Sequence, residues 1–208
     1  FDSYLKAEPC AISAVDWYDS IGRTEYVLLY LHGFSATQHE GDSVRFWIAD
    51  RLQANAYYPR ISGHGLEEED SVRYATFTAT AAWEKAKKDF ALATTLGNKV
   101  IIMSCSTGTP LALKLSATYP NKVHALVNYS PNIRLNDPLA ALVNDPWGLE
   151  LLKWTSNQDF RDLSPREDGI VEDCKHRSYC WESVIQMQWL LEPTMIESTF
   201  KAVRATSL

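Results

Sequence analysis

Three small residues follow an apolar run in the stretch 99–108, and they place a serine hydroxyl where it could act as a nucleophile. The stretch reads KVIIMSCSTG, and its apolar part predicts a buried strand over 99–103. Residues typical of a helix follow from 110 to 119. A strand that turns directly into a helix presents the residue at the turn, here Ser106. A serine so placed attacks a carbonyl carbon when a base takes its proton.

The spacing of small residues favours Ser106 over its neighbours as that nucleophile. Such a tight turn needs small residues two positions before and after its centre, and Ser104 and Gly108 fill those positions. Centring the turn on Cys105 or on Ser104 would place a bulky methionine or isoleucine there. The alternative is that Ser106 is a buried structural serine after a strand of another doubly wound fold.

A second loop has the residues that acyl transfer needs for stabilising an oxyanion. Backbone N–H groups usually do this, and one would come from Thr107, the residue after the serine. The other would come from Phe34, which follows a continuously apolar predicted strand at 26–31. Gly33 lets the backbone turn close to a substrate. We interpret His32 as a residue that orders this loop rather than as the base.

Strands and helices alternate over the first two thirds of the chain, which predicts a parallel sheet with helices on both faces. The predicted strands are 26–31, 56–61, 99–103 and 123–129, and the predicted helices are 43–54, 78–96 and 110–119. The first helix is expected to bury an apolar side made of Val44, Trp47, Ile48 and Leu52. Gly97-Asn98 sits where a helix stop is expected.

The character of the sequence changes after Asp137. Residues 138–208 contain no convincing buried strand, and their tryptophans lie in helix-like stretches broken by prolines. We therefore expect a core at 1–137 and a helical cap or lid at 138–208. The cap would lie over the carboxyl edge of the sheet.

In order and spacing, three motifs resemble the α/β-hydrolase superfamily, and within it the capped carboxylesterase and monoacylglycerol-lipase-like serine hydrolases. They are Leu31-His32-Gly33-Phe34, Ser62-Gly63-His64-Gly65 and Ser104-Cys105-Ser106-Thr107-Gly108, within a match over about residues 25–130. The resemblance implies Ser106 as the catalytic nucleophile and Phe34 with Thr107 as the oxyanion hole. It places His32, Gly33 and His64 in the oxyanion loop and the rim of the site.

The catalytic acid and histidine of such a hydrolase follow the serine in the chain, after later strands. His124 falls inside a predicted strand, and His176 lies on a polar helical stretch. Asp137 is a possible acid, although a loop aspartate before a proline is the simpler interpretation. We expect the carboxyl-terminal strands to be absent from this chain, and the acid and base to lie beyond Leu208.

Composition excludes several classes of function. A formal charge of −6 without a basic run argues against nucleic acid as a partner. No apolar stretch approaches the roughly 20 residues that a membrane helix needs. Dinucleotide and phosphate-loop motifs are absent, and the histidines show no metal-ligand spacing, so no cofactor or metal is expected. Cys174 and Cys180 are close enough in sequence for a disulfide, the alternative being two free thiols.

Together these features predict a serine hydrolase that cleaves a carboxylic ester of an uncharged or acyl-chain substrate through an acyl-enzyme on Ser106. A non-catalytic binding protein that keeps the fold but lacks the base is the alternative, and perhydrolysis or C–C bond hydrolysis is a third possibility. The protein would be cytoplasmic, or exported after removal of a signal that the chain from Phe1 does not show.

Overall fold

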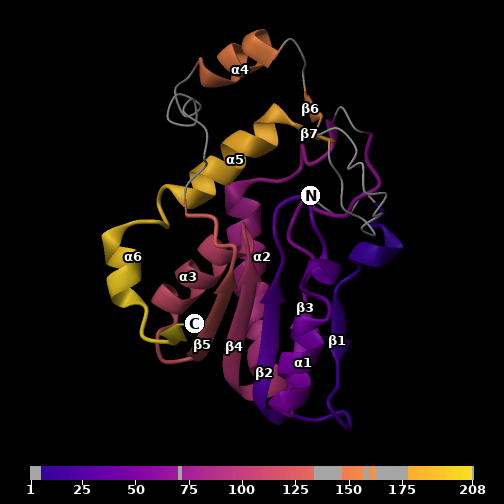
Figure 1. The fold of residues 1–208 in the computed structure, drawn as a ribbon, viewed down its shortest axis with the longest axis vertical. Helices are drawn as coiled ribbons and strands as arrows, with labels where there is room; N and C mark the ends of the chain where they lie inside the picture. Colours follow the sequence, from indigo (N-terminus) through magenta and orange to yellow (C-terminus); the bar gives the residue numbers. More distant parts are fainter. Residues whose placement is uncertain (1–5, 70–71, 134–146, 157–159, 163–177, 208) are drawn as a thin grey trace.

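The protein forms one main sheet of six strands, in the order β1-β3-β2-β4-β5-β8 (Figure 1). The computed structural model describes residues 6–69, 72–133, 147–156, 160–162 and 178–207. The strands are β1 (Ala14–Asp16), β2 (Thr24–Leu31), β3 (Asn55–Tyr58), β4 (Gly97–Cys105), β5 (Val123–Tyr129) and β8 (Thr206–Ser207). β1 is antiparallel to β3, and the remaining neighbouring pairs are parallel. The predicted parallel sheet is therefore confirmed, with an antiparallel strand added at one edge.

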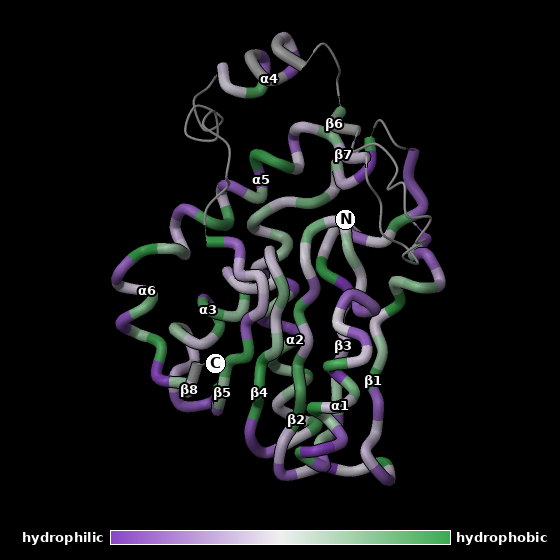
Figure 2. The backbone as a smooth tube through the Cα atoms, viewed as in Figure 1, coloured by the Kyte–Doolittle hydropathy of each residue, from purple (hydrophilic) through white to green (hydrophobic). Residues whose placement is uncertain are grey.

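The two central strands are buried on both faces, and their side chains alternate between two cores. Val27, Leu29 and Leu31 of β2 belong to one hydrophobic cluster, whereas Leu28 and Tyr30 belong to the other. This explains why the buried parts of β2 and β4 are unbroken apolar runs rather than alternating patterns, and why both strands carry green segments in Figure 2.

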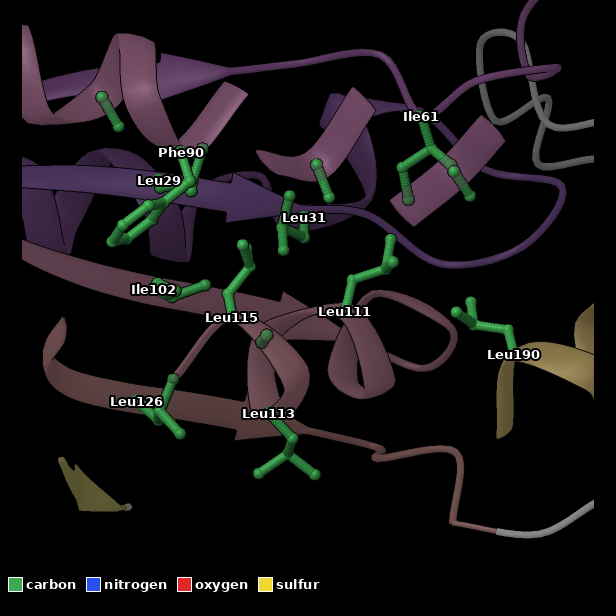
Figure 3. Close-up of a cluster of buried hydrophobic side chains, with 14 of the residues drawn as sticks. Leu29, Leu31, Ile61, Phe90, Ile102, Leu111, Leu113, Leu115, Leu126 and Leu190 are labelled. Atoms are coloured by element: carbon green, nitrogen blue, oxygen red, sulfur yellow. The ribbon is translucent and has the colours of Figure 1, made fainter. Parts of the chain in front are cut away.

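Helices cover both faces of the sheet, as predicted. α2 (Ala79–Leu96) and α3 (Gly108–Thr118) pack with the larger cluster, and α1 (Val44–Arg51) packs with the smaller one. Figure 3 shows Leu111 and Leu115 of α3 directed toward strand residues such as Leu31 and Ile102. The helix that follows Ser106 is thereby fixed against the central strands by side chains that are almost completely buried.

The prediction of which side of α1 is buried is wrong in part. Val44 and Trp47 are 55% and 62% exposed, while Arg45 and Ala49 of the same helix are buried. The buried guanidinium of Arg45 lies over the Tyr58 ring at 3.9 Å and donates to Asp42. A cation that is paired with a carboxylate and stacked on a ring can occupy an inward position, which apolar periodicity does not anticipate.

The expected helix stop at Gly97-Asn98 takes another form. α2 ends at Leu96 and β4 begins at Gly97, whose backbone is extended rather than left-handed. A Cβ on Gly97 would lie 2.8 Å from the backbone nitrogen of Val27. The glycine is needed for the close approach of β4 to β2 at that point.

The described part of the last third contains helices and three short strands, where the sequence predicted a helical cap without a buried strand. α4 (Gly148–Ser156) and α5 (Trp181–Leu191) lie beyond the carboxyl ends of the sheet strands, next to the hairpin of β6 (Phe160–Asp162) and β7 (Ser178–Cys180) (Figure 1). α6 (Glu197–Ala202) and β8 return to the side of α3 and β5. Strands of two or three residues are too short to produce a recognisable apolar pattern. Two one-turn helices complete the described elements, η1 (Pro9–Ala11) and η2 (Gln38–Gly41).

The suggested disulfide between Cys174 and Cys180 is wrong, because Cys180 is a free, buried thiol. Cys174 lies outside the described residues. Cys10 is disulfide-bonded, whereas Cys105 is a buried cysteine that forms no disulfide.

Candidate active site at the carboxyl edge of the sheet

Ser106 occupies a strained turn between β4 and α3. Its φ angle is +45°, in the left-handed region that costs free energy for a residue with a Cβ atom. The surrounding chain holds this conformation: the Ser106 carbonyl accepts hydrogen bonds from the N–H groups of Thr109 (3.0 Å) and Asn132 (3.2 Å). The Ser106 N–H donates to the Tyr129 carbonyl at 3.4 Å. The side chain at the turn is partly exposed although its neighbours on both sides are buried.

Two glycines bring this turn against the loop that follows β2. A Cβ on Gly108 would lie 2.1 Å from the Leu31 carbonyl oxygen, so α3 can begin there only with glycine. A Cβ on Gly33 would lie 3.2 Å from the Cβ of Ser106. The residues flanking Ser106 and the loop of residues 32–34 are therefore in direct contact.

The other two candidate nucleophiles near the turn are engaged or enclosed. Ser104 is completely buried, and its hydroxyl bonds to Asn128 Oδ1 at 2.6 Å and to Thr109 Oγ1 at 3.1 Å. Cys105 is 5% exposed. Of the three, Ser106 alone is accessible from outside the sheet.

His32 fixes the direction of the peptide group that precedes Phe34. Its Nε2 accepts the Ile61 N–H at 3.0 Å, so the proton is on Nδ1, which donates to the Gly33 carbonyl at 2.8 Å. The Gly33–Phe34 peptide is trans, so its N–H points away from the carbonyl that His32 holds. Within the described part of the chain, neither the Phe34 N–H nor the Thr107 N–H donates a hydrogen bond.

Burial keeps both histidines of this edge neutral. It lowers the pKa of His32 to about 4, and the pKa of His64 falls well below its usual range for the same reason. His64 Nδ1 lies 3.2 Å from the Ser62 carbonyl, while its Nε2 has no partner among the described residues. Its ring is surrounded by Phe34 and by the aromatic rings of Tyr74 and Phe77, with centroids 4.9 to 5.2 Å away.

α5 contributes an apolar neighbour that the sequence did not single out. The Thr107 hydroxyl lies 3.3 Å from the sulfur of Met187, and the Asn132 side-chain amide lies 3.7 Å from it. Met187 is 9% exposed. Helical spacing marks it only as a core residue, because nothing local in the sequence links α5 to the turn after β4.

Glu40 is a second residue that the sequence reasoning missed. Its carboxylate accepts the Gly33 N–H at 2.7 Å and the Tyr30 hydroxyl at 3.3 Å. A single acidic residue in a polar stretch is ordinarily solvated, so only the fold shows that this one reaches the loop of residues 32–34.

A base for Ser106 is not found among the histidines that the structure describes. None of them makes a hydrogen bond to Ser106: His32 and His64 are enclosed, His39 bonds to Asp42 at 3.2 Å, and the exposed His124 lies against Tyr26.

Asp137 and His176 lie outside the described residues. No group of three His, Cys, Asp or Glu side chains gathers as a metal site would require, in the described residues.

Comparison with solved structures shows that the fold is that of the α/β-hydrolases. One match is a metagenome-derived lipolytic enzyme of the LipS and LipT pair, with a TM-score of 0.74, 16% identity, and coverage of 97% of this chain and 76% of that one. The monoacylglycerol lipase of Paleococcus ferrophilus matches with a TM-score of 0.63 and 14% identity, over 94% of this chain and 74% of the lipase. No family model matches the sequence, nor does any curated protein.

A soluble variant of the monoglyceride lipase from Saccharomyces cerevisiae has a TM-score of 0.53 at 14% identity, over 86% of this chain and 64% of that one. These identities are too low to carry function with the fold. Among the helices of the described residues, none is both long and apolar enough to cross a membrane.

Proposed function

We propose that the protein is a serine hydrolase that cleaves a carboxylic ester of an uncharged or acyl-chain substrate. Ser106 Oγ attacks the ester carbonyl carbon as its proton passes to a base, giving a tetrahedral oxyanion. The oxyanion collapses, the C–O bond to the alcohol breaks, and the alcohol leaves with a proton. Water then hydrolyses the acyl-enzyme by the same steps and releases the carboxylic acid.

The observation that carries this proposal is a pair of backbone N–H groups on either side of an accessible serine, neither of which has a partner among the described residues. Phe34 and Thr107 lie next to Gly33 and Ser106, which are in contact. Thr107 also stands at the start of α3, where the helix dipole favours negative charge. An oxyanion hole needs donors fixed before the reaction starts, and His32 fixes the Phe34 peptide by holding the Gly33 carbonyl.

The strained backbone of Ser106 supports the same assignment. A left-handed conformation at a serine costs on the order of 1 kcal/mol or more, and such cost is concentrated at functional sites. A purely structural serine would gain nothing from it. The structural matches that are lipolytic enzymes and lipases agree with an ester as substrate.

The base and its acid come from outside the described residues in this proposal. Either of two sources would have to supply the base and the acid. One is a segment beyond Leu208, as the sequence predicts, and the other is His176 with Asp137. His32 and His64 are unsuited to the role. His32 uses both ring nitrogens, and burial opposes the positive charge that either ring would carry after it takes the proton.

The substrate preference follows from what lies above Ser106. We propose that the part of the expected 138–208 cap around α4 and α5 covers the site, since Met187 of α5 already contacts Thr107. Phe34 and Tyr179 pack together on the same side, with ring centroids 5.2 Å apart. Apolar groups of this kind suit an acyl chain or an uncharged small molecule.

Turnover of p-nitrophenyl esters with acyl chains of two to twelve carbons tests the proposal. We expect the protein to hydrolyse them and the Ser106→Ala variant to lose at least about a thousandfold in kcat/KM. Ser130→Ala is the matched control, because Ser130 is also at the carboxyl edge with a positive φ but is exposed. Absence of turnover in the intact protein would favour the non-catalytic alternative, and turnover that survives Ser106→Ala would exclude this serine.

A further inference from the structure

We propose that Glu40 is a positioning residue for the oxyanion hole, which rests on the function proposed above. Its carboxylate accepts the Gly33 N–H at 2.7 Å, while His32 holds the Gly33 carbonyl at 2.8 Å. Both polar groups of Gly33 are therefore bound. The two peptide planes that meet at Gly33 determine where the Phe34 N–H points, so Glu40 and His32 together set that donor.

The local structure around Glu40 is built to bring its side chain to the loop. η2 begins after Thr37, whose buried hydroxyl accepts the His39 N–H at 3.4 Å. At the end of η2, a Cβ on Gly41 would lie 2.8 Å from the Tyr30 ring, so the helix lies directly on that ring. This contact fixes the distance between Glu40 and the end of β2.

A chain of hydrogen bonds links Glu40 to the other side of the Ser106 turn. The Tyr30 hydroxyl donates to Glu40 Oε2, so it accepts from the Tyr129 hydroxyl, 2.5 Å away. The Tyr30 and Tyr129 rings are nearly parallel, at an angle of 4°. The Tyr129 carbonyl in turn accepts the Ser106 N–H. The carboxylate thus connects the loop after β2 with the strand beside the serine.

The carboxylate and the Ser106 side chain both lie on the side of Gly33 where a Cβ would project. The point where a Cβ of Gly33 would stand is 2.9 Å from Glu40 Oε1 and 3.2 Å from Ser106 Cβ. A hydrogen bond from an amide to a charged carboxylate is stronger than one to a neutral acceptor. A displacement of the loop by about 1 Å is enough to cost roughly a hundredfold in rate.

Steady-state kinetics with the Glu40→Ala, Glu40→Gln and Tyr129→Phe variants test the proposal. We expect Glu40→Ala to lower kcat roughly 10- to 100-fold with KM changed less than about threefold, because oxyanion donors act in the transition state. Glu40→Gln restores most of the activity, since its amide oxygen accepts in the same place, and Tyr129→Phe shows the smallest loss. Glu25→Gln, an exposed residue paired with Lys99, is the matched control.

An independent readout follows the Gly33 amide directly by NMR. Histidine labelled with ¹³C at its carbonyl and glycine labelled with ¹⁵N select two amides in this sequence, Gly33 and Gly65. In Glu40→Ala the Gly33 proton signal should move to higher field while Gly65 stays in place and reports an intact fold.

An unchanged Gly33 signal, or a rise in KM at constant kcat, would overturn the positioning role. If the intact protein hydrolyses no ester, the proposed function fails, whereas the Gly33 signal still shows whether Glu40 holds the loop.

Discussion

Two loops at the carboxyl edge each bury a histidine beside a glycine, and they use it differently. In the 32–34 loop, both ring nitrogens of His32 form hydrogen bonds to backbone groups. One partner is the Gly33 carbonyl, and the other is the N–H of Ile61, in the segment after β3. In the 62–65 loop, His64 has one bond to the backbone and otherwise packs among aromatic rings. The first imidazole orients a peptide next to Ser106, whereas the second serves mainly as an aromatic ring. Both histidines are buried, so burial does not distinguish the two roles. The difference lies at Nε2, which accepts a hydrogen bond in His32 and has no partner among the described residues in His64.

The largest effect on stability is expected where the start of α3 contacts the end of β2 and the 32–34 loop. Gly108→Ala would place a Cβ 2.1 Å from the Leu31 oxygen, and we expect a loss of about 3 kcal/mol in the free energy of unfolding. Urea denaturation followed by circular dichroism measures it. Gly22→Ala is the control, because no atom lies within 4 Å of a Cβ there. Equal stability of the two variants would refute the described contact.

Replacing each histidine with phenylalanine separates the two loops. His32→Phe leaves the Ile61 N–H and the Gly33 carbonyl without that partner, and it should cost about 2 to 3 kcal/mol. His64→Phe keeps an aromatic ring at this position and removes a buried nitrogen that has no partner among the described residues, so its stability should stay within about 1 kcal/mol of the parent. The same urea titration compares them, and similar losses for both variants would contradict the distinction.

Acid should destabilise the protein through both histidines. The folded-state pKa of His32 is about 4, below its ordinary 6.5, so the unfolded chain binds the proton first as pH falls. The stability is complete above pH 6.5 and decreases toward pH 4, by up to about 1.4 kcal/mol per pH unit for each histidine. Unfolding free energies at intervals from pH 7.5 to pH 5 measure the slope. His64→Phe should reduce it, and a slope that the variant leaves unchanged would contradict the burial of a neutral His64.

The smallest effect concerns the backbone of Ser106. Ser106→Gly removes the Cβ from a residue with a φ of +45°, so we expect a gain of about 1 kcal/mol in stability, offset in part by the flexibility of the unfolded chain. Ser106→Ala keeps the Cβ and should show no such gain. Thermal unfolding of the two variants side by side makes the comparison, and a gain in both would show that the hydroxyl rather than the backbone is responsible.

Much of the sheet could be predicted because its central strands are long and apolar. The strand predicted at 123–129 has the same bounds as β5, and the small residues around Ser106 pointed to the turn. These features depend on neighbours in the sequence. Periodicity, turn chemistry and residue size are all local, so they can be interpreted without knowing the fold.

The remaining features depend on contacts that the folded chain makes and that no local sequence pattern encodes. The exposed face of α1 follows from the pairing of Arg45 with Tyr58 and Asp42, and β8 forms only where β5 offers an open edge. The contact of Met187 with Thr107 joins positions 80 residues apart. Glu40 belongs to this group as well. Its partner Gly33 is near in sequence, but the placement of Glu40 depends on the packing of Gly41 on the Tyr30 ring.

Covalent labelling of the nucleophile tests the central claim most directly. The protein is treated with a fluorophosphonate ester, which phosphonylates an activated serine, and the digested peptides are sequenced by mass spectrometry. We expect one adduct on Ser106, in the peptide that contains Ser104 and Cys105, and no adduct in Ser106→Ala. An adduct on Ser104 or another residue, or ester turnover by a protein whose Ser106 stays unmodified, would contradict it.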